Sequence, residues 1–291
     1  MNNDLQVRSS TMETTLRPMH AGDLEAMHRL VQQMSWPHRP EDCAQLFALG
    51  AGTVAVDATG PVGVGLRWSF GHDVGTIGMV LVAPERQGRG IGRALMMTLI
   101  AGSAPRALLL NATVEGLGLY LKLGFVPTGL VHQHQAHLAE GTTMPLVPAV
   151  SLRRARATDH AALCALDAAA FGADRSALIN RLLAIGETWL VDRADRPVGF
   201  AILRTFGRGM MIGPILAPSE DEAIALVATA AQAAPPGLLR IDISGHAERL
   251  SSWLTAAGLP AVDTVTAMLR GRWPGTRNGP QRFGLALQAV G

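Results

Sequence analysis

Three glycines alternate with other residues directly after an apolar run, a spacing typical of an anion-binding loop. The run contains Val80, Leu81 and Val82 and ends at Pro84, and Gln87-Gly88-Arg89-Gly90-Ile91-Gly92-Arg93 follows. Proline cannot donate to a β-ladder and so ends a strand, whereas glycines let backbone N–H groups approach a ligand closely. A helical pattern follows the loop, so several N–H donors and the positive end of a helix dipole would point at one place. The pattern predicts a pyrophosphate site.

Other phosphate-binding motifs fit this loop less well. No Gly-Lys-Ser/Thr follows, as a P-loop requires, and Arg93 stands where a dinucleotide fingerprint needs a third small residue. The loop does match the looser pattern Q/R-x-x-G-x-G/A. That pattern recurs by chance at residues 204–209, where it lies between two apolar stretches and predicts a hairpin turn. Only the first copy has a strand before it and a helix after it, and this context carries the prediction.

The single tyrosine is the second chemical signal. Tyr120 lies in Leu119-Tyr120-Leu121-Lys122-Leu123-Gly124-Phe125. A phenol is protonated at neutral pH and can act as a general acid; the structural alternative is a ring that only packs beside the sheet. The glycine loop and this helix ending, Leu-Tyr-x-x-Leu-Gly-Phe, together resemble the motifs of the GNAT acetyltransferases. The distance between the two motifs along the chain is also the one usual in that family. The two motifs cover residues 80–125, and the elements before them fit from about residue 15.

The resemblance implies that acetyl-CoA lies between two splayed parallel strands, here residues 78–82 and 108–111. The backbone of Val80, Leu81 and Val82 would pair with the pantetheine amides, and one N–H group would polarise the thioester carbonyl. The pyrophosphate would contact the loop residues Gln87, Gly88, Arg89, Gly90, Ile91, Gly92 and Arg93. Many relatives hold the pantetheine arm with an Asn seven residues before the tyrosine. Thr113 occupies that place here and Asn111 lies two residues earlier, so both are candidate contacts.

In this mechanism a neutral amine attacks the thioester directly and Tyr120 protonates the departing sulfur. A base must first deprotonate the amine, and the candidates are His72, Asp73 and Glu115, none of which the sequence favours over the others.

Three histidines lie further along the chain, at positions 132, 134 and 137. His132 and His134 would share one face of a strand, as two metal ligands do. No Asp, Glu or Cys lies near enough to complete a site, so we predict no metal. This strand is expected to line the substrate cleft instead, with a histidine as a conceivable proton acceptor.

The elements that hold these residues occur twice along the chain. Residues 15–17 followed by Asp23 recur as residues 151–153 followed by Asp159, an offset of 136. Further pairs keep the same order: 61–63 with 197–199, 77–84 with 212–218, and 123–125 with 257–259. The alternation of strands and helices predicts an α/β fold. We predict two tandem GNAT-like domains, 14–139 and 150–291, each a mixed, centrally splayed β-sheet flanked by helices.

The second copy lacks the chemistry of the first. Where the glycine loop would be, residues 215–223 contain no glycine and three carboxylates, which disfavour pyrophosphate by like-charge repulsion. Trp253-Leu254 stands near the place of Tyr120 and offers no hydroxyl acid. We therefore predict that the second domain binds no CoA.

Composition limits the class of protein. The 291 residues are 48% hydrophobic and 16% charged, values typical of a globular protein. The net charge is +2 and aromatic residues make up 4%, so a basic, aromatic nucleic-acid surface is not expected. No apolar run reaches the roughly 18 residues of a membrane span, and residues 1–15 lack the apolar stretch of a signal peptide. Two isolated cysteines exclude a disulfide framework. We expect a cytoplasmic protein that engages neither membranes nor nucleic acids.

The sequence thus predicts an acetyl-CoA-dependent N-acetyltransferase that acts on a primary amine. The second domain is expected to cover the acceptor opening and favour a small molecule over a protein tail. A rival hypothesis is a non-enzymatic acyl-CoA sensor, which would keep the glycine loop but could dispense with the acid. A structural protein built from two degenerate domains is a third, and it predicts no CoA binding.

Overall fold

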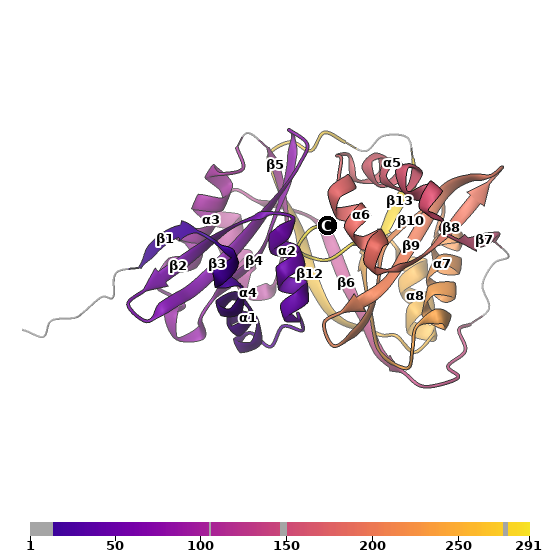
Figure 1. Ribbon diagram of the computed structural model, residues 1–291, viewed down its shortest axis with the longest axis horizontal. Coiled ribbons are helices and arrows are strands. Elements are labelled where there is room, and N and C mark those ends of the chain that lie inside the picture. Colours follow the sequence, from indigo (N-terminus) through magenta and orange to yellow (C-terminus); the bar gives the residue numbers. More distant parts are fainter. Residues whose placement is uncertain (1–13, 105, 146–149, 276–278) are drawn as a thin grey trace, which may run out of the picture.

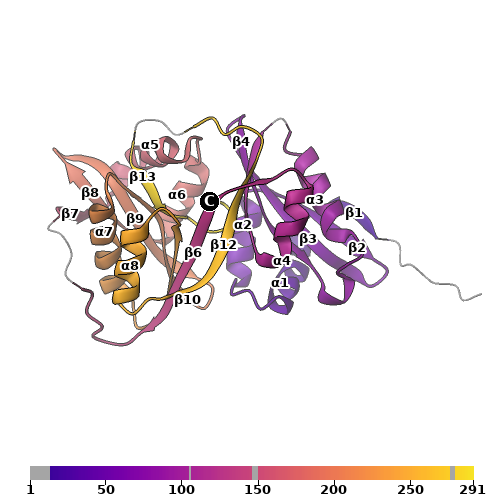
Figure 2. The ribbon, with the colours of Figure 1, turned by 180° about the vertical axis from the view of Figure 1, so that it is seen from behind.

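The computed structural model describes residues 14–104, 106–145, 150–275 and 279–291 (Figure 1). Two α/β halves lie side by side, and the view from behind in Figure 2 shows the same arrangement. Both views place the end of the sequence, marked C, between the halves. Among the described residues, no helix is long and apolar enough to cross a lipid bilayer.

The first half runs from β1 to β6. Its strands are β1 (Thr15–Pro18), β2 (Ala51–Asp57), β3 (Gly60–Phe70), β4 (Val74–Val82), β5 (Ala107–Ala112) and β6 (Val126–Leu138). Its helices are α1 (Leu24–Gln33), α2 (Pro40–Ala48), α3 (Ile91–Ala101) and α4 (Val114–Lys122), with short 3-10 turns η1 (Ala21–Asp23) and η2 (Pro84–Arg86).

The second half repeats this order and adds one strand. Its strands are β7 (Leu152–Arg154), β8 (Glu187–Arg193), β9 (Arg196–Phe206), β10 (Gly209–Ala217), β11 (Gly237–Ser244), β12 (Ala261–Arg270) and the additional β13 (Gln281–Gly284). Its helices are α5 (His160–Phe171), α6 (Ser176–Ile185), α7 (Glu220–Ala233) and α8 (Glu248–Ala256), with the 3-10 turn η3 (Ala157–Asp159).

The two halves exchange a strand and so form one sheet. The order is β1-β2-β3-β4-β5-β12-β6-β11-β13-β10-β9-β8-β7. Strand β12, from the second half, pairs antiparallel with β5, and β6, from the first half, pairs antiparallel with β11. The sequence pattern does not predict this exchange. Each half contributes a strand to the part of the sheet that the other half forms. The division into residues 14–139 and 150–291 therefore stays a prediction about folding units.

Helices cover both faces of the sheet. The helices α1, α2, α5 and α6 share one hydrophobic core, which also takes in Ala286, Leu287 and Val290 from the segment after β13. On the other face, α3 and α4 pack over β4 and β5, while α7 and α8 pack over the second half's strands. The segment 285–291 thus belongs to the core of the face that α1 and α2 cover.

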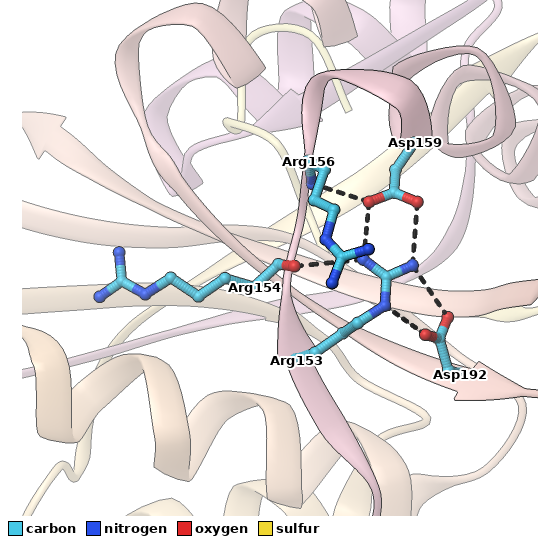
Figure 3. Close-up of polar contacts among 5 residues, drawn as sticks. All are labelled: Arg153, Arg154, Arg156, Asp159 and Asp192. Atoms are coloured by element: carbon cyan, nitrogen blue, oxygen red, sulfur yellow. Dashed lines mark hydrogen bonds and ion pairs between the residues drawn. The ribbon is translucent and has the colours of Figure 1, made fainter. Parts of the chain in front are cut away.

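An arginine–aspartate motif marks the start of each half and confirms the repeat. Arg17 holds the carboxylate of Asp23 with two hydrogen bonds of 2.7 Å, and the N–H of His20 donates to the same carboxylate. In the second half, Arg153 holds Asp159 in the same way and the N–H of Arg156 replaces that of His20, as Figure 3 shows. Each carboxylate therefore ties the first strand of its half to the start of the next helix.

Asp192 distinguishes the second motif. Its carboxylate also accepts from Arg153, so that one guanidinium joins two carboxylates (Figure 3). The first half has Val56 at this position, since Val56 pairs with Pro61 as Asp192 pairs with Pro197. The next residue of β2, Asp57, pairs with Arg86, which precedes the glycine loop, and with the hydroxyl of Thr59. The first half thus uses this carboxylate to fix the loop that its sequence predicts to bind phosphate.

Candidate active site

Strands β4 and β5 run parallel and then separate. Their register pairs Val74–Thr76 with Ala107–Leu109 and goes no further. From Ile77 to Val82, β4 is paired with β3 alone among the described residues. The edge of β4 that faces β5 therefore presents backbone N–H and C=O groups free to bond a ligand. The predicted pantetheine contacts Val80, Leu81 and Val82 all lie on this edge.

A β-bulge bends β4 at this point. Gly78 pairs with Leu66 and Leu81 with Val64, so Met79 and Val80 together oppose a single residue of β3. Met79 has a φ of 52°, which a non-glycine residue rarely adopts. Bulges and positive φ values collect near functional sites because they redirect backbone groups. Here the bulge redirects the backbone groups on the free edge of β4, where β4 separates from β5.

The glycine loop joins β4 to α3. Gly88 and Gly90 have φ values of 74° and 81°, and a Cβ at either position would meet no atom within 4 Å. Gly90 is the N-cap of α3 and provides no side chain, so the first N–H groups of the helix are left without a side-chain partner. The loop itself is fixed from within, because Gln87 donates to the carbonyl of Val82 at 3.1 Å and Arg89 to that of Glu85 at 3.3 Å.

Open space at the glycines, orphan N–H groups and a helix N-terminus together fit a pyrophosphate. Ile91 is buried and anchors the start of α3, whereas Arg89 and Arg93 are exposed cations beside the loop. The predicted phosphate contacts are therefore together at one end of the splay, and their role in binding stays a prediction.

Tyr120 lies on α4, on the same face of the sheet as α3. Its ring packs edge-on against Phe125, 6.2 Å between centroids, within a cluster that also includes Ile77 and Leu110 from the two splayed strands. Burial raises the pKa of the Tyr120 phenol to about 12, so it stays protonated at neutral pH. A Cβ at Gly116 would lie 2.8 Å from the tyrosine ring, so this glycine makes room for it.

The two predicted pantetheine contacts after β4 are engaged within the protein. The hydroxyl of Thr113 caps α4 by accepting from the N–H of Gly116 at 3.4 Å. The Asn111 amide donates to the carbonyl of Gln288 at 2.7 Å. Asn111 alternates along β5 with Leu110 and Ala112, which pack under α3 and α4, so its side chain points to the opposite face. Their contact with CoA stays a prediction.

A cavity of about 310 Å³ opens on that opposite face, at the bulge of β4. The first half lines it with Gly78, Met79 and Asn111, and with Trp36 and His38 from the loop between α1 and α2. The second half lines it with Arg208, Arg240, Asp263 and residues 287–289. The cavity therefore lies across the bulged edge from α3 and α4, and both halves make its walls.

The hairpin between β9 and β10 brings the second half to this cavity. The N–H of its turn residue Gly207 donates to Asp42 of α2 at 2.9 Å, and Arg208 donates to the carbonyl of Ser35 at 3.4 Å. Phe206 packs edge-on against His38, 5.1 Å between centroids. This is the segment whose glycine pattern copies that of the first loop, and the predicted hairpin turn is confirmed.

The segment after β13 forms the floor of the cavity. Ala289 packs against Gly78, where a Cβ would lie 3.0 Å from its Cα. Two buried arginines hold the segment by its carbonyls, Arg204 at Ala286 and Arg175 at Val290 and Gly291. Arg175 is itself paired with Asp167, and neither side chain is exposed. Strand β13 itself ends at Gly284, before this segment begins.

His132 and His134 of β6 do not line the cavity, although we expected a histidine there. His134 is buried, and its ring bonds the carbonyl of Leu259 and the hydroxyl of Ser251, while His132 bonds Thr264. The residues of β6 that line the cavity are Gln133 and Gln135. The strand thus lines the cavity with glutamines rather than with its histidines, and its place in a substrate cleft stays a prediction.

Two candidate bases also lie elsewhere. His72 and Asp73 precede β4 at its paired end, away from the bulge, and neither lines the cavity. His38, which the sequence did not suggest, does line it. Burial, with the nearby charge of Arg240, lowers the pKa of His38 to about 4, so the imidazole is neutral at physiological pH. Within the described ranges, no group of three His, Cys, Asp or Glu side chains is placed to hold a metal ion.

The second half closes the equivalent splay with a strand. Strands β10 and β11 pair in parallel over Met210–Ile212 and Leu239–Ile241, as β4 and β5 do. Beyond this point β13 lies between them, pairing with Ile215–Ala217 on one side and Ile243 on the other. The space that stays free in the first half is thus filled by the protein's own backbone.

The helix after β10 begins without glycines. Ser219 caps α7 by accepting from the N–H of Glu222. The acidic residues there have partners, since Glu222 pairs with Arg193 and Asp221 with Arg249, while Glu220 accepts two backbone N–H groups of α8. The Tyr120 position corresponds to Leu254, because both residues accept from a backbone N–H five residues on, at Phe125 and Leu259. Leu254 has no acid to offer.

Comparison with known proteins agrees with this duplicated architecture. Residues 49–127 match a family described as an acetyltransferase (GNAT) domain, and residues 163–281 match a second family of the same description. The chain is 30% identical over 281 residues to the uncharacterized N-acetyltransferase YitH of Bacillus subtilis (strain 168), covering 94% of this chain and 97% of that protein. The chain belongs to the GNAT acetyltransferase family.

Solved structures support the fold of this GNAT as a whole. A presumed acetyltransferase from Pyrococcus horikoshii superposes with a TM-score of 0.77 at 20% identity, covering 96% of both chains. A tandem GNAT protein from the clavulanic acid biosynthesis pathway superposes with a TM-score of 0.64 at 16% identity, covering 88% of this chain and 98% of that one. The tandem GNAT arrangement predicted from the repeats is confirmed, and the protein is an acyltransferase.

Proposed function

We propose that this GNAT transfers the acetyl group of acetyl-CoA directly to the primary amine of a small molecule, using the first half alone as the acetyl-CoA site. The observation that carries the proposal is the contrast between the two splays. The edge of β4 from Ile77 to Val82 is free beside a glycine loop, whereas β13 fills the matching space beside β10. One half keeps room for pantetheine and pyrophosphate and the other does not.

In the proposed reaction the acceptor amine enters from the cavity on one side of β4, and Tyr120 lies on the other side. The amine nitrogen forms a bond to the acetyl carbon, the carbon–sulfur bond breaks, and the departing thiolate takes the proton of the Tyr120 hydroxyl. Backbone N–H groups of β4 polarise the thioester carbonyl. The amine loses its proton to water or to a polar group of the cavity wall, and water returns a proton to the phenolate. Because burial raises the pKa of Tyr120 to about 12, its hydroxyl is protonated at neutral pH and has a proton to donate.

A small acceptor is supported by the cavity on the far side of the bulge. Both halves wall a space of about 310 Å³, the size of a small-molecule pocket. The β9–β10 hairpin and the segment 285–291 both contribute residues to the wall of this cavity. A folded protein substrate would need this second-half wall to move aside.

The proposal is tested by incubating the protein with acetyl-CoA and a panel of primary amines, with free thiol and N-acetylated product measured together. We expect acetylated product from small amines in amounts equal to the CoA released. Acetylation of folded proteins without turnover of any small amine would contradict the acceptor class. Binding of acetyl-CoA with no product from any acceptor would contradict the enzyme and favour the sensor.

A further inference from the structure

The acceptor-side cavity carries a specific pattern of charge. Four of its lining residues bear charges or can bear them: His38, Arg208, Arg240 and Asp263. The pKa of His38 is lowered to about 4 by burial, so this residue is neutral at physiological pH. Arg240 is paired with the buried carboxylate of Asp242 through two hydrogen bonds of 3.0 and 2.8 Å. The charges left for a ligand are therefore one cation and one anion.

Arg208 is the cation. It stands in the two-residue turn between β9 and β10, exposed, and its only hydrogen bond in the described part of the chain is the long one to the carbonyl of Ser35. No carboxylate among the described residues pairs with it. The turn itself is fixed, because the N–H of Gly207 is bonded to Asp42 and a Cβ at Gly207 would lie 3.0 Å from Pro37. A fixed backbone thus presents a guanidinium with donors to spare.

Asp263 is the anion. It lies on β12, opposite Gln133 of β6, and is exposed. Its carboxylate accepts the N–H of the next residue, Thr264, at 2.8 Å, and no arginine or lysine within the described ranges pairs with it. Gln133 and Gln135, beside it in the wall, add amide donors and acceptors. The cavity therefore offers an unpaired carboxylate together with neutral hydrogen-bonding groups.

We propose that the acceptor of this GNAT is an amine that also carries an anionic group, a carboxylate or phosphate, and that Arg208 of the second half binds that group. The inference rests on the proposed acetyl transfer and names its substrate class. The planar guanidinium matches the two oxygens of such an anion. The ammonium form of the acceptor meets the opposite charge of Asp263 before it loses its proton. A zwitterion thus satisfies both unpaired charges, and a simple alkylamine leaves Arg208 without a partner.

The proposal also gives the second half a function. That half lacks a free splay, yet its hairpin supplies the residue that selects the substrate. Arg208 is a specificity residue and not an acid or base, so its removal should weaken acceptor binding more than the chemical step. The signature is a rise in the KM for an anionic acceptor with the KM for acetyl-CoA unchanged.

The test compares matched acceptors with and without the anion. The panel pairs α-amino acids with their α-amides, and 2-aminoethyl phosphate with ethanolamine, and CoA release and N-acetyl product are measured for each. We expect kcat/KM for the anionic member of the best pair to exceed that of the neutral member by roughly ten- to a hundredfold, the range of a charge-assisted hydrogen-bonded pair. The amino-acid and phosphate arms distinguish the two kinds of anion.

Two arginine variants then assign the effect to the residue. Arg208→Ala should abolish the preference for the anion, and Arg208→Lys should restore part of it. Arg196→Ala is the control, because Arg196 is also exposed but lies at the far end of the 11-residue strand β9. It should leave the preference unchanged.

Four outcomes are possible, and each supports or overturns a stated claim. A preference for anionic acceptors that Arg208→Ala removes would support the proposal. Equal or better turnover of neutral amines by the unmodified protein would overturn it while leaving the acetyltransferase proposal intact. A preference that survives in Arg208→Ala would overturn the assignment to this residue, and no acetylation of any acceptor would reject the proposed function itself.

Discussion

The two halves of this GNAT begin alike and part at the splay of their central strands. Each opens with an arginine that clamps an aspartate, and each separates its fourth strand from its fifth after three paired residues. The first half leaves the gap open beside a glycine loop, whereas the second fills it with β13. The unpaired backbone N–H and C=O groups along the edge of a splayed strand need hydrogen-bond partners. In the first half this edge has no partner strand among the described residues, and in the second half β13 pairs with it.

The second half nevertheless stays tied to the first. Its strand β12 completes the first half's sheet, its β9–β10 hairpin walls the cavity, and the segment 285–291 forms the floor. If the first half alone binds acetyl-CoA, as we propose, the second half shapes the acceptor side of that site. We expect substitutions in the first half to change chemistry, and those in the second to change stability and choice of acceptor.

The largest effect is expected for Tyr120→Phe. Loss of the hydroxyl removes the proposed acid and should lower kcat by about 10²- to 10⁴-fold, with little change in the Kd for acetyl-CoA. The matched control is Trp253→Phe on α8, the aromatic residue next to the counterpart of Tyr120, which should leave kcat unchanged. A Tyr120→Phe enzyme with normal kcat would show that the ring only packs beside the sheet.

A second prediction concerns the strand that fills the second splay. Phe283 on β13 is 3% exposed and packs in the core of the second half. Phe283→Ala should lower the free energy of unfolding by about 3–5 kcal/mol, measured by urea denaturation. Below its unfolding transition, this variant should still bind acetyl-CoA with the original Kd. Loss of acetyl-CoA binding in the folded variant would mean that the second splay takes part in the cofactor site.

The smallest effect is expected from the repeated arginine–aspartate motif. Hydrogen bonds from Arg17 and Arg153 hold the pKa of Asp23 and Asp159 at about 2, below the ordinary 3.8. Because the folded pKa is depressed, each carboxylate stabilises the protein above pH 3.8, and this contribution is lost as the pH falls toward 2. Asp23→Asn and Asp159→Asn should each lower Tm at pH 6 and narrow the difference between pH 6 and pH 3.

The Asp23→Asn change should have the larger effect, because Arg17 then has no carboxylate partner among the described residues, whereas Arg153 still holds Asp192 after Asp159→Asn. Melting curves of the two variants at both pH values provide the measurement. Equal pH dependence in the original protein and both variants would show that these carboxylates titrate alike in the folded and unfolded chains.

The sequence predicts what depends on local pattern. The glycine loop, the tyrosine helix, the hairpin at residues 204–209 and the order of elements in both halves can be read from short-range signals, and the repeat exposes the duplication. The roles of Tyr120 and the loop residues stay predictions. The missed features depend on partners distant in sequence: β6 and β12 each alternate like any strand, and nothing local says that they exchange.

The acceptor cavity escaped prediction for the same reason. His38 and Arg208 are separated in the sequence by more than one whole repeat and meet only because the hairpin docks on the loop between α1 and α2. In the strand at residues 126–138 the alternation places Gln133 and Gln135 in the cavity wall, whereas the ring of His134 bonds the carbonyl of Leu259. The sequence does contain one signal, because Arg208 lies in the predicted glycine turn between two apolar stretches.

The central claim is that one half of this GNAT binds acetyl-CoA and the other does not, and calorimetric titration tests it most directly. Gly92→Glu and Gly92→Gln form a matched pair, because a Cβ at Gly92 makes only ordinary contacts, 3.6 Å to Leu119 and 3.8 Å to Val82. A carboxylate in the first turn of α3 suits the helix but repels phosphate. We predict one acetyl-CoA per chain, with a Kd at least about tenfold weaker in Gly92→Glu than in Gly92→Gln. Two sites per chain, or equal affinity in the two variants, would contradict the account.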